Sequence, residues 1–149
     1  MATYDVAMAT NKAGTSQDNV FHKTRRDHSN EIAEDYVEAI AQLHSEDGAC
    51  RVTRLARRLG VSHVTANRTV ARLVSRGLVT TSPYQPIELT DSGRRLARTA
   101  RARHEIVIDF LISIGVPTEI ATADSEGIEH HCSPETLKAM KHFSNTRNH

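Results

Sequence analysis

The sequence is poor in aromatic residues and cysteines and has no long apolar run. Phenylalanine, tyrosine and tryptophan make up 4% of the 149 residues, and tryptophan is absent, which disfavours a β-sandwich and favours helices packed through aliphatic side chains. No apolar stretch approaches the ~18 residues that cross a bilayer, and the N-terminus does not resemble a secretory signal. Cys50 and Cys132 form no zinc or redox spacing. These absences predict a helical protein of the cytoplasm without membrane partners.

Acidic residues are scarce in the middle of the chain. From Gly48 to Arg103 there are twelve arginines against two acidic residues, Glu88 and Asp91. From His104 to the end there are seven acidic residues against Lys138, Lys141 and Arg147. The formal net charge of +1 hides this asymmetry. A basic centre beside an acidic C-terminal part indicates two functions in one chain.

The N-terminal third divides into a polar segment and a helix. Residues 1–28 are polar and lack periodicity, which predicts a tail without order. A helix is then expected from Ser29 or Asn30 to Gly48. Ile32, Tyr36, Ile40 and Leu43 recur at helical spacing and form its apolar stripe.

The next segment has the pattern of a winged helix-turn-helix. The stretch "VTRLARRLG" predicts a short amphipathic helix, Gly60 a turn, and Ser62 the cap of a second helix that ends near Gly77. The stretch "LVTTSPYQPIELT" then predicts two short strands around a turn. We therefore expect a mainly α protein: a winged helix-turn-helix DNA-binding domain over residues 29–90 with a two-strand wing, followed by an all-α dimerisation domain over 91–149.

Arginines in this segment indicate nucleic-acid binding. Seven arginines and no acidic residue lie between Gly48 and Ile87, too biased for an ordinary solvated surface, and arginines neutralise phosphates. Residues early in the second helix of a helix-turn-helix read base edges, and wing residues contact the minor groove or phosphates. The candidate DNA-binding residues are Arg51, Ser62, His63, Thr65, Ala66, Asn67, Arg68, Arg72, Tyr84 and Gln85. His63 could equally face solvent.

The C-terminal part predicts three helices: a long one from about Asp91 to Ile114, one from Pro117, and one capped by Ser133. The stretch "EGIEHH" places Glu126, Glu129 and His130 on one helix face. Asp35 and Glu38 share a face of the first helix, and His104 lies on the long one. Converging carboxylates repel one another, and divalent cations would cancel their charge. Carboxylate and imidazole ligands suit Mn²⁺, Fe²⁺ or Zn²⁺. A solvated helix face explains the same pattern.

Several stretches resemble the DtxR/MntR family of bacterial metalloregulators, and most closely its manganese-responsive branch. They are "EDYVEAI", "GVSHVTANRTVARLVSRGLV", "LTDSGRRLA", "RHEIVIDFL" and "EGIEHHCSPET", in order over about residues 30–143. The resemblance implies metal ligands at Asp35, Glu38, His104, Glu126, Glu129 and His130, with two Mn²⁺ per protomer bridged by the glutamates. The iron-responsive branch has Met and Cys where this sequence has Asp35 and Glu129. The SH3-like domain of many members is not expected, because the sequence ends at His149.

The resemblance further implies a homodimeric repressor of genes such as those for manganese uptake. Metal would promote its binding to a palindromic operator. Four alternatives stay open on the sequence: an iron-responsive regulator of the same family, a winged-helix regulator of a small organic ligand, a helical di-metal enzyme, and an architectural DNA-binding protein without an effector. The enzyme would leave the arginine-rich helix-turn-helix unexplained, and no catalytic residues are expected.

Overall fold

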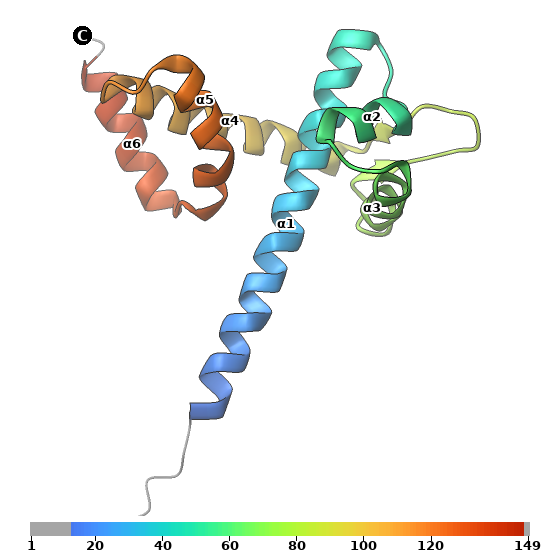
Figure 1. Ribbon diagram of the computed structural model, residues 1–149, viewed down its shortest axis with the longest axis horizontal. Coiled ribbons are helices and arrows are strands. Elements are labelled where there is room, and N and C mark those ends of the chain that lie inside the picture. Colours follow the sequence, from blue (N-terminus) through green and yellow to red (C-terminus); the bar gives the residue numbers. More distant parts are fainter. Residues whose placement is uncertain (1–12, 148–149) are drawn as a thin grey trace, which may run out of the picture. The chain divides into compact units, whose positions relative to one another are not determined.

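The computed structural model describes residues 13–147 and consists mainly of helices (Figure 1). Its helices are α1 (Ala13–Asp47), α2 (Val52–Leu59), α3 (His63–Ser75), α4 (Asp91–Ser113), α5 (Thr118–Ile128) and α6 (Pro134–Arg147). Strands β1 (Val79–Thr80) and β2 (Glu88–Leu89) form an antiparallel pair, and a 3₁₀ turn, η1 (Glu129–His131), separates α5 from α6. The expected fold class, mainly α with a two-strand wing, is confirmed.

The chain divides into two units, Met1–Glu31 and Ile32–His149. The described residues of the first unit, 13–31, belong to helix α1. The expected lack of order over residues 1–28 and the expected helix start at Ser29 or Asn30 are therefore wrong for residues 13–28, while residues 1–12 lie outside the described part. No proline interrupts the chain from Ala13 to Asp47, so a polar stretch can extend a helix that apolar packing stabilises further along.

The second unit has a core built by α1, α2, α3 and the wing. Tyr36, Val37, Ile40 and Leu43 on α1 are buried, and Leu55 and Leu73 pack into the same cluster. Three of the four residues in the expected apolar stripe are thus buried, and Ile32 is half-buried at its edge. The apolar face of α1 is thus buried in the head, and Asp35 and Glu38 lie on the opposite side of the helix.

The helix-turn-helix forms where the sequence places it. Gly60 ends α2 with φ of 66°, a left-handed conformation that glycine adopts without a steric penalty. The Ser62 side chain caps α3 by accepting a hydrogen bond from the Thr65 amide at 3.1 Å. These two residues form the turn between α2 and α3, and the outer face of α3 is exposed.

Helix α4 starts tightly against the wing. The Thr90 hydroxyl caps it by accepting a hydrogen bond from the Gly93 amide at 3.1 Å. A Cβ at residue 93 would lie 2.0 Å from the Leu78 carbonyl oxygen, so only glycine fits. Ala97, one turn later, belongs to the core of the head. The first turns of α4 are therefore fixed to the winged-helix head.

The second half of α4 packs against α5 and α6 (Figure 1). Val107, Ala121 and Leu137 are buried there, one from each helix. The rings of Phe110 and Phe143 meet edge to face, with centroids 5.7 Å apart. Helix α4 thus belongs to both the head and the C-terminal helices. Over the described residues, no helix combines the length and apolarity needed to cross a bilayer.

Candidate metal centre and DNA-binding face

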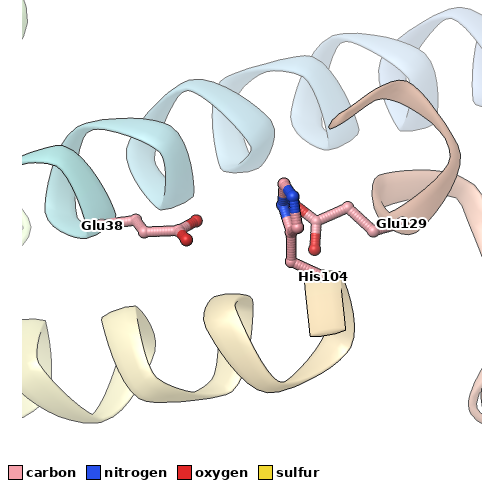
Figure 2. A group of neighbouring side chains, drawn as sticks. All are labelled: Glu38, His104 and Glu129. Carbon is pink, nitrogen blue, oxygen red and sulfur yellow. The ribbon is translucent and has the colours of Figure 1, made fainter. Parts of the chain in front are cut away.

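Three elements bring a carboxylate, an imidazole and a second carboxylate together. Glu38 comes from α1, His104 from α4 and Glu129 from η1, and one ligand atom of each lies within 4.8 Å of the others. Figure 2 shows the Glu38 carboxylate directed toward the His104 ring, with the Glu129 carboxylate beside that ring. Oxygen and imidazole nitrogen donors at this separation suit a divalent cation of the Mn²⁺, Fe²⁺ or Zn²⁺ type.

Glu129 is the most deeply buried acid of this cluster, with a side chain 1% exposed. Its Oε1 lies 3.7 Å from Nδ1 of His104 and 3.5 Å from Nε2 of His130. Its Oε2 and the Nδ1 of His104 are buried with no hydrogen-bond partner among the described residues. A buried carboxylate oxygen without a donor is costly, and a bound cation would satisfy both atoms. The donor set therefore fits a metal ion.

Burial raises the pKa of Glu129 to about 7, against the positive charge of His130, which lowers it. Burial also raises the pKa of Asp35 and of Glu38, and His130 and His104 respectively oppose the rise. Three carboxyl groups are thus held in a place that disfavours their charged forms. A divalent cation would reverse this preference.

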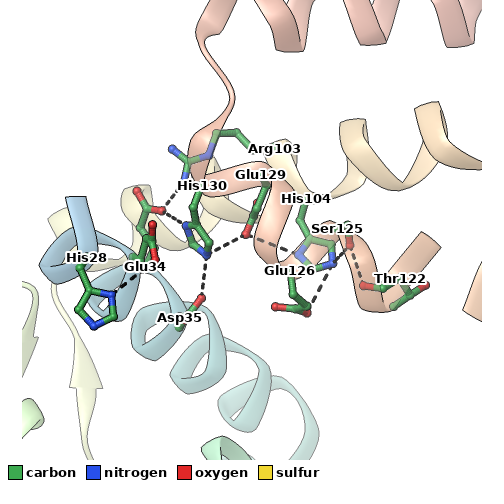
Figure 3. Close-up of polar contacts among 11 residues, drawn as sticks. His28, Glu34, Asp35, Arg103, His104, Thr122, Ser125, Glu126, Glu129 and His130 are labelled. Atoms are coloured by element: carbon green, nitrogen blue, oxygen red, sulfur yellow. Dashed lines mark hydrogen bonds and ion pairs between the residues drawn. The ribbon is translucent and has the colours of Figure 1, made fainter. Parts of the chain in front are cut away.

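His130 joins Glu129 to helix α1. Its Nε2 lies 3.2 Å from Oδ1 of Asp35, and its Nδ1 lies 3.0 Å from Oε2 of Glu34 (Figure 3). Burial lowers the pKa of His130, but Asp35, Glu129 and Glu34 together outweigh burial and raise it. The ring is 5% exposed, so its neighbours and not solvent determine its orientation.

His104 joins Glu129 to the end of α5. Its Nε2 lies 3.0 Å from the Ser125 hydroxyl oxygen and 3.6 Å from Oε1 of Glu126. Ser125 donates its own proton to the Thr122 carbonyl at 2.7 Å, so its oxygen can accept from His104. The Glu126 side chain is 64% exposed. Glu126 thus lies at the rim of the cluster while Glu129 lies inside it.

The structure brings together all six residues that the sequence singled out as metal ligands. Five of them form a continuous chain of contacts, in the order Asp35, His130, Glu129, His104 and Glu126. Glu38 lies near His104 and Glu129. The expectation that Glu126, Glu129 and His130 share one helix face is wrong. Helix α5 ends at Ile128, and η1 carries the last two residues. The change to a 3₁₀ turn is accompanied by burial of Glu129 and His130 while Glu126 stays exposed.

Sequence reasoning missed three residues of this region. Glu34 accepts a hydrogen bond from Arg103 and contacts His130, and Ser125 contacts His104. The sequence offered a signal for two of them, since Glu34 and Arg103 directly precede candidate ligands. An acidic or basic residue beside a candidate ligand is so common in sequences that neither residue could be selected as functional without the structure. Ser125 has no signal of this kind.

The outer face of α3 carries most of the candidate DNA-binding residues. Ser62, His63, Thr65, Asn67, Arg68 and Arg72 are exposed, as is Arg51 before α2. The Asn67 amide lies 3.0 Å from Nδ1 of His63, so these two side chains are held together on that face. Ala66 is fully buried, which excludes it from base contact and corrects our expectation for this residue.

The wing adds Tyr84 and Gln85 to the same side. Tyr84 is 95% exposed and has φ of 63°, a left-handed conformation that is unusual for a tyrosine. A groove of about 500 Å³ runs between the wing and the two helices, and its lining includes Arg51, Asn67, Tyr84 and Gln85. Exposed arginines, amides and a tyrosine around one groove can contact phosphates and base edges. The head and the cluster define a winged-helix DNA-binding protein with a carboxylate–imidazole site.

Comparisons with known proteins agree with this class. Residues 29–87 match the family model described as iron dependent repressor, N-terminal DNA binding domain. Residues 90–149 match the iron dependent repressor, metal binding and dimerisation domain. The transcriptional regulator MntR of Escherichia coli O157:H7 is 44% identical over 124 residues, which are 83% of this chain and 80% of that protein. The HTH-type regulator MntR of Bacillus subtilis (strain 168) is 36% identical over 100 residues, 67% and 70% of the two chains.

Two solved structures show the same fold. A manganese-dependent transcriptional repressor in complex with manganese has a TM-score of 0.66 and 28% identity, over 75% of this chain and 52% of that one. The IdeR protein of T. acidophilum has a TM-score of 0.62 and 27% identity, over 72% and 51%. This chain therefore spans about half the length of both. The chain belongs to the DtxR/MntR family of metal-dependent transcriptional regulators, as the sequence motifs implied.

Proposed function

We propose that the protein is a manganese-dependent transcriptional repressor that binds operator DNA as a homodimer when its metal centre is loaded. One observation carries this proposal. The carboxylate–imidazole cluster takes ligand atoms from α1, which belongs to the head, and from α4 and η1 of the helical domain. A metal bound there would connect the DNA-binding part to the dimerisation part. The matches to manganese regulators support the choice of metal.

The proposed ligands are Asp35, Glu38, His104, Glu126, Glu129 and His130. Four carboxylates and two imidazoles provide enough donors for two Mn²⁺ per protomer, with the buried Glu129 lying between the two histidines. A donor set rich in oxygen and free of sulfur favours Mn²⁺, although Fe²⁺ and Zn²⁺ accept the same ligands. Bound cations would supply positive charge that cancels the repulsion among the acids.

The protein's own residues transmit this change in charge. Asp35 and Glu38 lie on the face of α1 opposite Tyr36, Val37 and Ile40, which pack into the core of the head. Mutual repulsion among uncompensated acids weakens the attachment of α1 to α4 and η1. Cancelling the charge of the acids would strengthen the attachment of α1 to α4 and η1. In a homodimer, this stronger attachment would fix the spacing of the two α3 helices. Protein two-fold symmetry then matches a palindromic operator.

The head would read that operator through α3 and the wing. Ser62, His63, Thr65, Asn67 and Arg68 are proposed to face base edges, since they lie at the exposed start of α3. The proposed contacts to phosphates or the minor groove are Arg51, Arg72, Tyr84 and Gln85. Because the target is chromosomal DNA, we propose that the protein acts in the cytoplasm. Genes for manganese uptake are the proposed targets.

The first test is operator binding by fluorescence anisotropy at fixed salt, with a palindromic site from the region upstream of the protein's own gene. We expect Mn²⁺ to tighten binding relative to chelator in the wild type but not in Glu129→Ala. Glu119→Ala is the matched control, because Glu119 is an exposed acid on α5 away from the cluster. It should respond to Mn²⁺ as the wild type does.

The same assay separates the alternatives. Tight binding that ignores Mn²⁺ and Fe²⁺ would contradict the proposal and favour a regulator of an organic ligand. Equal affinity for operator and random DNA, with or without metal, would indicate an architectural protein. A response to Fe²⁺ at concentrations where Mn²⁺ has no effect would make the protein an iron-responsive member of the family.

A further inference from the structure

A partly buried ion pair lies beside the metal centre and takes no part in the proposed ligand set. Arg103 on α4 donates a hydrogen bond from Nη2 to Oε2 of Glu34 on α1. The same oxygen lies 3.0 Å from Nδ1 of His130. The side chains of Arg103, Glu34 and His130 are 25%, 13% and 5% exposed. Figure 3 shows the three in a row that leads to Asp35 and Glu129.

We propose that Glu34 is a positioning residue that fixes the ring orientation and the tautomer of His130, and that Arg103 holds Glu34 in place for this role. This inference rests on the proposed function, in which His130 is a metal ligand. It assigns roles to Glu34 and Arg103, which directly precede the proposed ligands Asp35 and His104 in the sequence.

The geometry around the His130 ring supports this role. Nδ1 faces Glu34, and Nε2 faces Asp35 at 3.2 Å and Glu129 at 3.5 Å. A neutral imidazole carries its proton on one nitrogen, and only the other has a lone pair for a metal. If Nδ1–H donates to Glu34, the lone pair of Nε2 points among the proposed ligands. If Nε2–H donates to Asp35 instead, the metal-binding position is blocked.

Glu34 itself is poorly suited to bind the metal. Its Oε2 is already shared by a guanidinium and an imidazole. The guanidinium of Arg103 places a positive charge beside Glu34, which disfavours a cation there. Together Glu34 and Arg103 add no net charge to the site. They can therefore orient His130 without changing the charge balance among the four proposed carboxylate ligands.

A purely structural role is the competing explanation, because the Arg103–Glu34 pair also connects α4 to α1. The two explanations differ in what an apolar replacement of both partners should do. Exchanging a buried ion pair for apolar side chains of similar size is often neutral or stabilising, since no buried charge is left unpaired. Such a double variant keeps a structural connection but removes the hydrogen-bond acceptor at Nδ1 of His130.

The experiment compares Glu34→Leu/Arg103→Leu with the wild type. Nitrogen NMR of ¹⁵N-histidine-labelled protein in chelator, at a pH above the pKa of His130, reports its tautomer. His130→Gln identifies the signals. We expect Nδ1–H in the wild type and Nε2–H in the double variant. Calorimetric Mn²⁺ titration should show affinity reduced by about 10- to 100-fold, as for other residues that orient metal-ligating histidines. Glu34→Gln keeps the size of the side chain and a hydrogen-bond acceptor, so it should lose less Mn²⁺ affinity than the double variant. It replaces the double variant in the experiment if the latter does not fold.

The matched control is Glu46→Leu/Arg58→Leu. Glu46 also lies on α1, and its ion pair is with Arg58 and not with a candidate ligand. This double variant should change neither the tautomer nor the affinity. An unchanged His130 tautomer and unchanged Mn²⁺ affinity in the Glu34 variants would overturn the inference. If the wild type itself ignored Mn²⁺, the proposed function would fail, while the NMR comparison in chelator would still show whether Glu34 sets the tautomer.

Discussion

At the scale of the residue, Glu129 makes the stability of the metal-free protein depend on pH. Burial raises its pKa from 4.5 to about 7, so the folded state binds this proton more tightly than the unfolded state does. The resulting stabilisation is complete below about pH 4.5 and is lost as pH rises through about 7. The raised pKa values of Asp35, Glu38 and His130 act in the same direction. We expect the melting temperature in chelator to fall between about pH 5 and about pH 8.

The variant Glu129→Gln tests the source of this dependence, because its side chain is neutral at every pH. In chelator its melting temperature should fall less with pH, and above about pH 7 it should exceed that of the wild type. Added Mn²⁺ should stabilise the wild type and not the variant. Glu119→Gln, an exposed exchange on α5, should keep the wild-type curve. A wild-type curve that stays flat across this range would contradict the raised pKa of Glu129.

The same residues show what the sequence could and could not predict about the site. Spacing and family resemblance selected Asp35, Glu38, His104, Glu126, Glu129 and His130, and the structure gathers these six. Neither signal could rank them by burial, because the exposure of Glu126 and the burial of Glu129 depend on the turn η1 after α5. The role of Glu34 depends on a contact across 96 positions of the chain with His130. Local patterns carry no information on such contacts.

At the scale of the element, the approach of α4 to β1 depends on Gly93. A Cβ there would lie 2.0 Å from the Leu78 carbonyl oxygen, a backbone atom that cannot move without disturbing the wing. We expect Gly93→Ala to destabilise the fold by about 1–3 kcal/mol, the usual cost of overpacking. Urea unfolding of the metal-free protein measures the change.

Gly127 offers the matched control for this prediction. It lies in the last turn of helix α5, and a Cβ there meets no atom of the described residues within 4 Å. Alanine favours a helix interior over glycine by up to about 1 kcal/mol, so Gly127→Ala should stabilise the fold or leave its stability unchanged. Equal effects of the two exchanges would show that helix propensity, and not the clash with Leu78, controls the stability at Gly93.

Elements also show where periodicity fails as a guide. The sequence predicted α2, α3 and α4 within two residues, because each has an apolar stripe or a capping residue, and it predicted the wing as two short strands around a turn. It missed the helical residues 13–28, which have no apolar stripe to detect. A helix that is already nucleated extends through polar residues at little cost. Sequence patterns detect buried faces, whereas a helix end without a buried face leaves little trace.

At the scale of the whole molecule, the arginine-rich head should make DNA binding strongly dependent on salt. Each charge that neutralises a phosphate adds about 0.9 to the slope of log K against log salt. We expect Arg51→Gln, at the groove between the wing and α3, to weaken binding to operator and random DNA by similar factors and to reduce this slope by about that amount. Lys138→Gln removes the same charge from exposed α6 and should leave the slope unchanged. Weaker binding to the operator alone would instead identify Arg51 as a base-reading residue.

The proposed coupling between metal and DNA must be reciprocal, because both ligands act on one equilibrium of the whole molecule. If Mn²⁺ tightens operator binding by a given factor, operator DNA must tighten Mn²⁺ binding by the same factor. Calorimetric titration of Mn²⁺ into the protein, alone and saturated with operator, should therefore yield the ratio obtained by anisotropy. In Glu129→Gln both ratios should approach one. If Mn²⁺ tightened operator binding without this gain in the protein's affinity for Mn²⁺, the metal would be acting on the DNA and not on the protein.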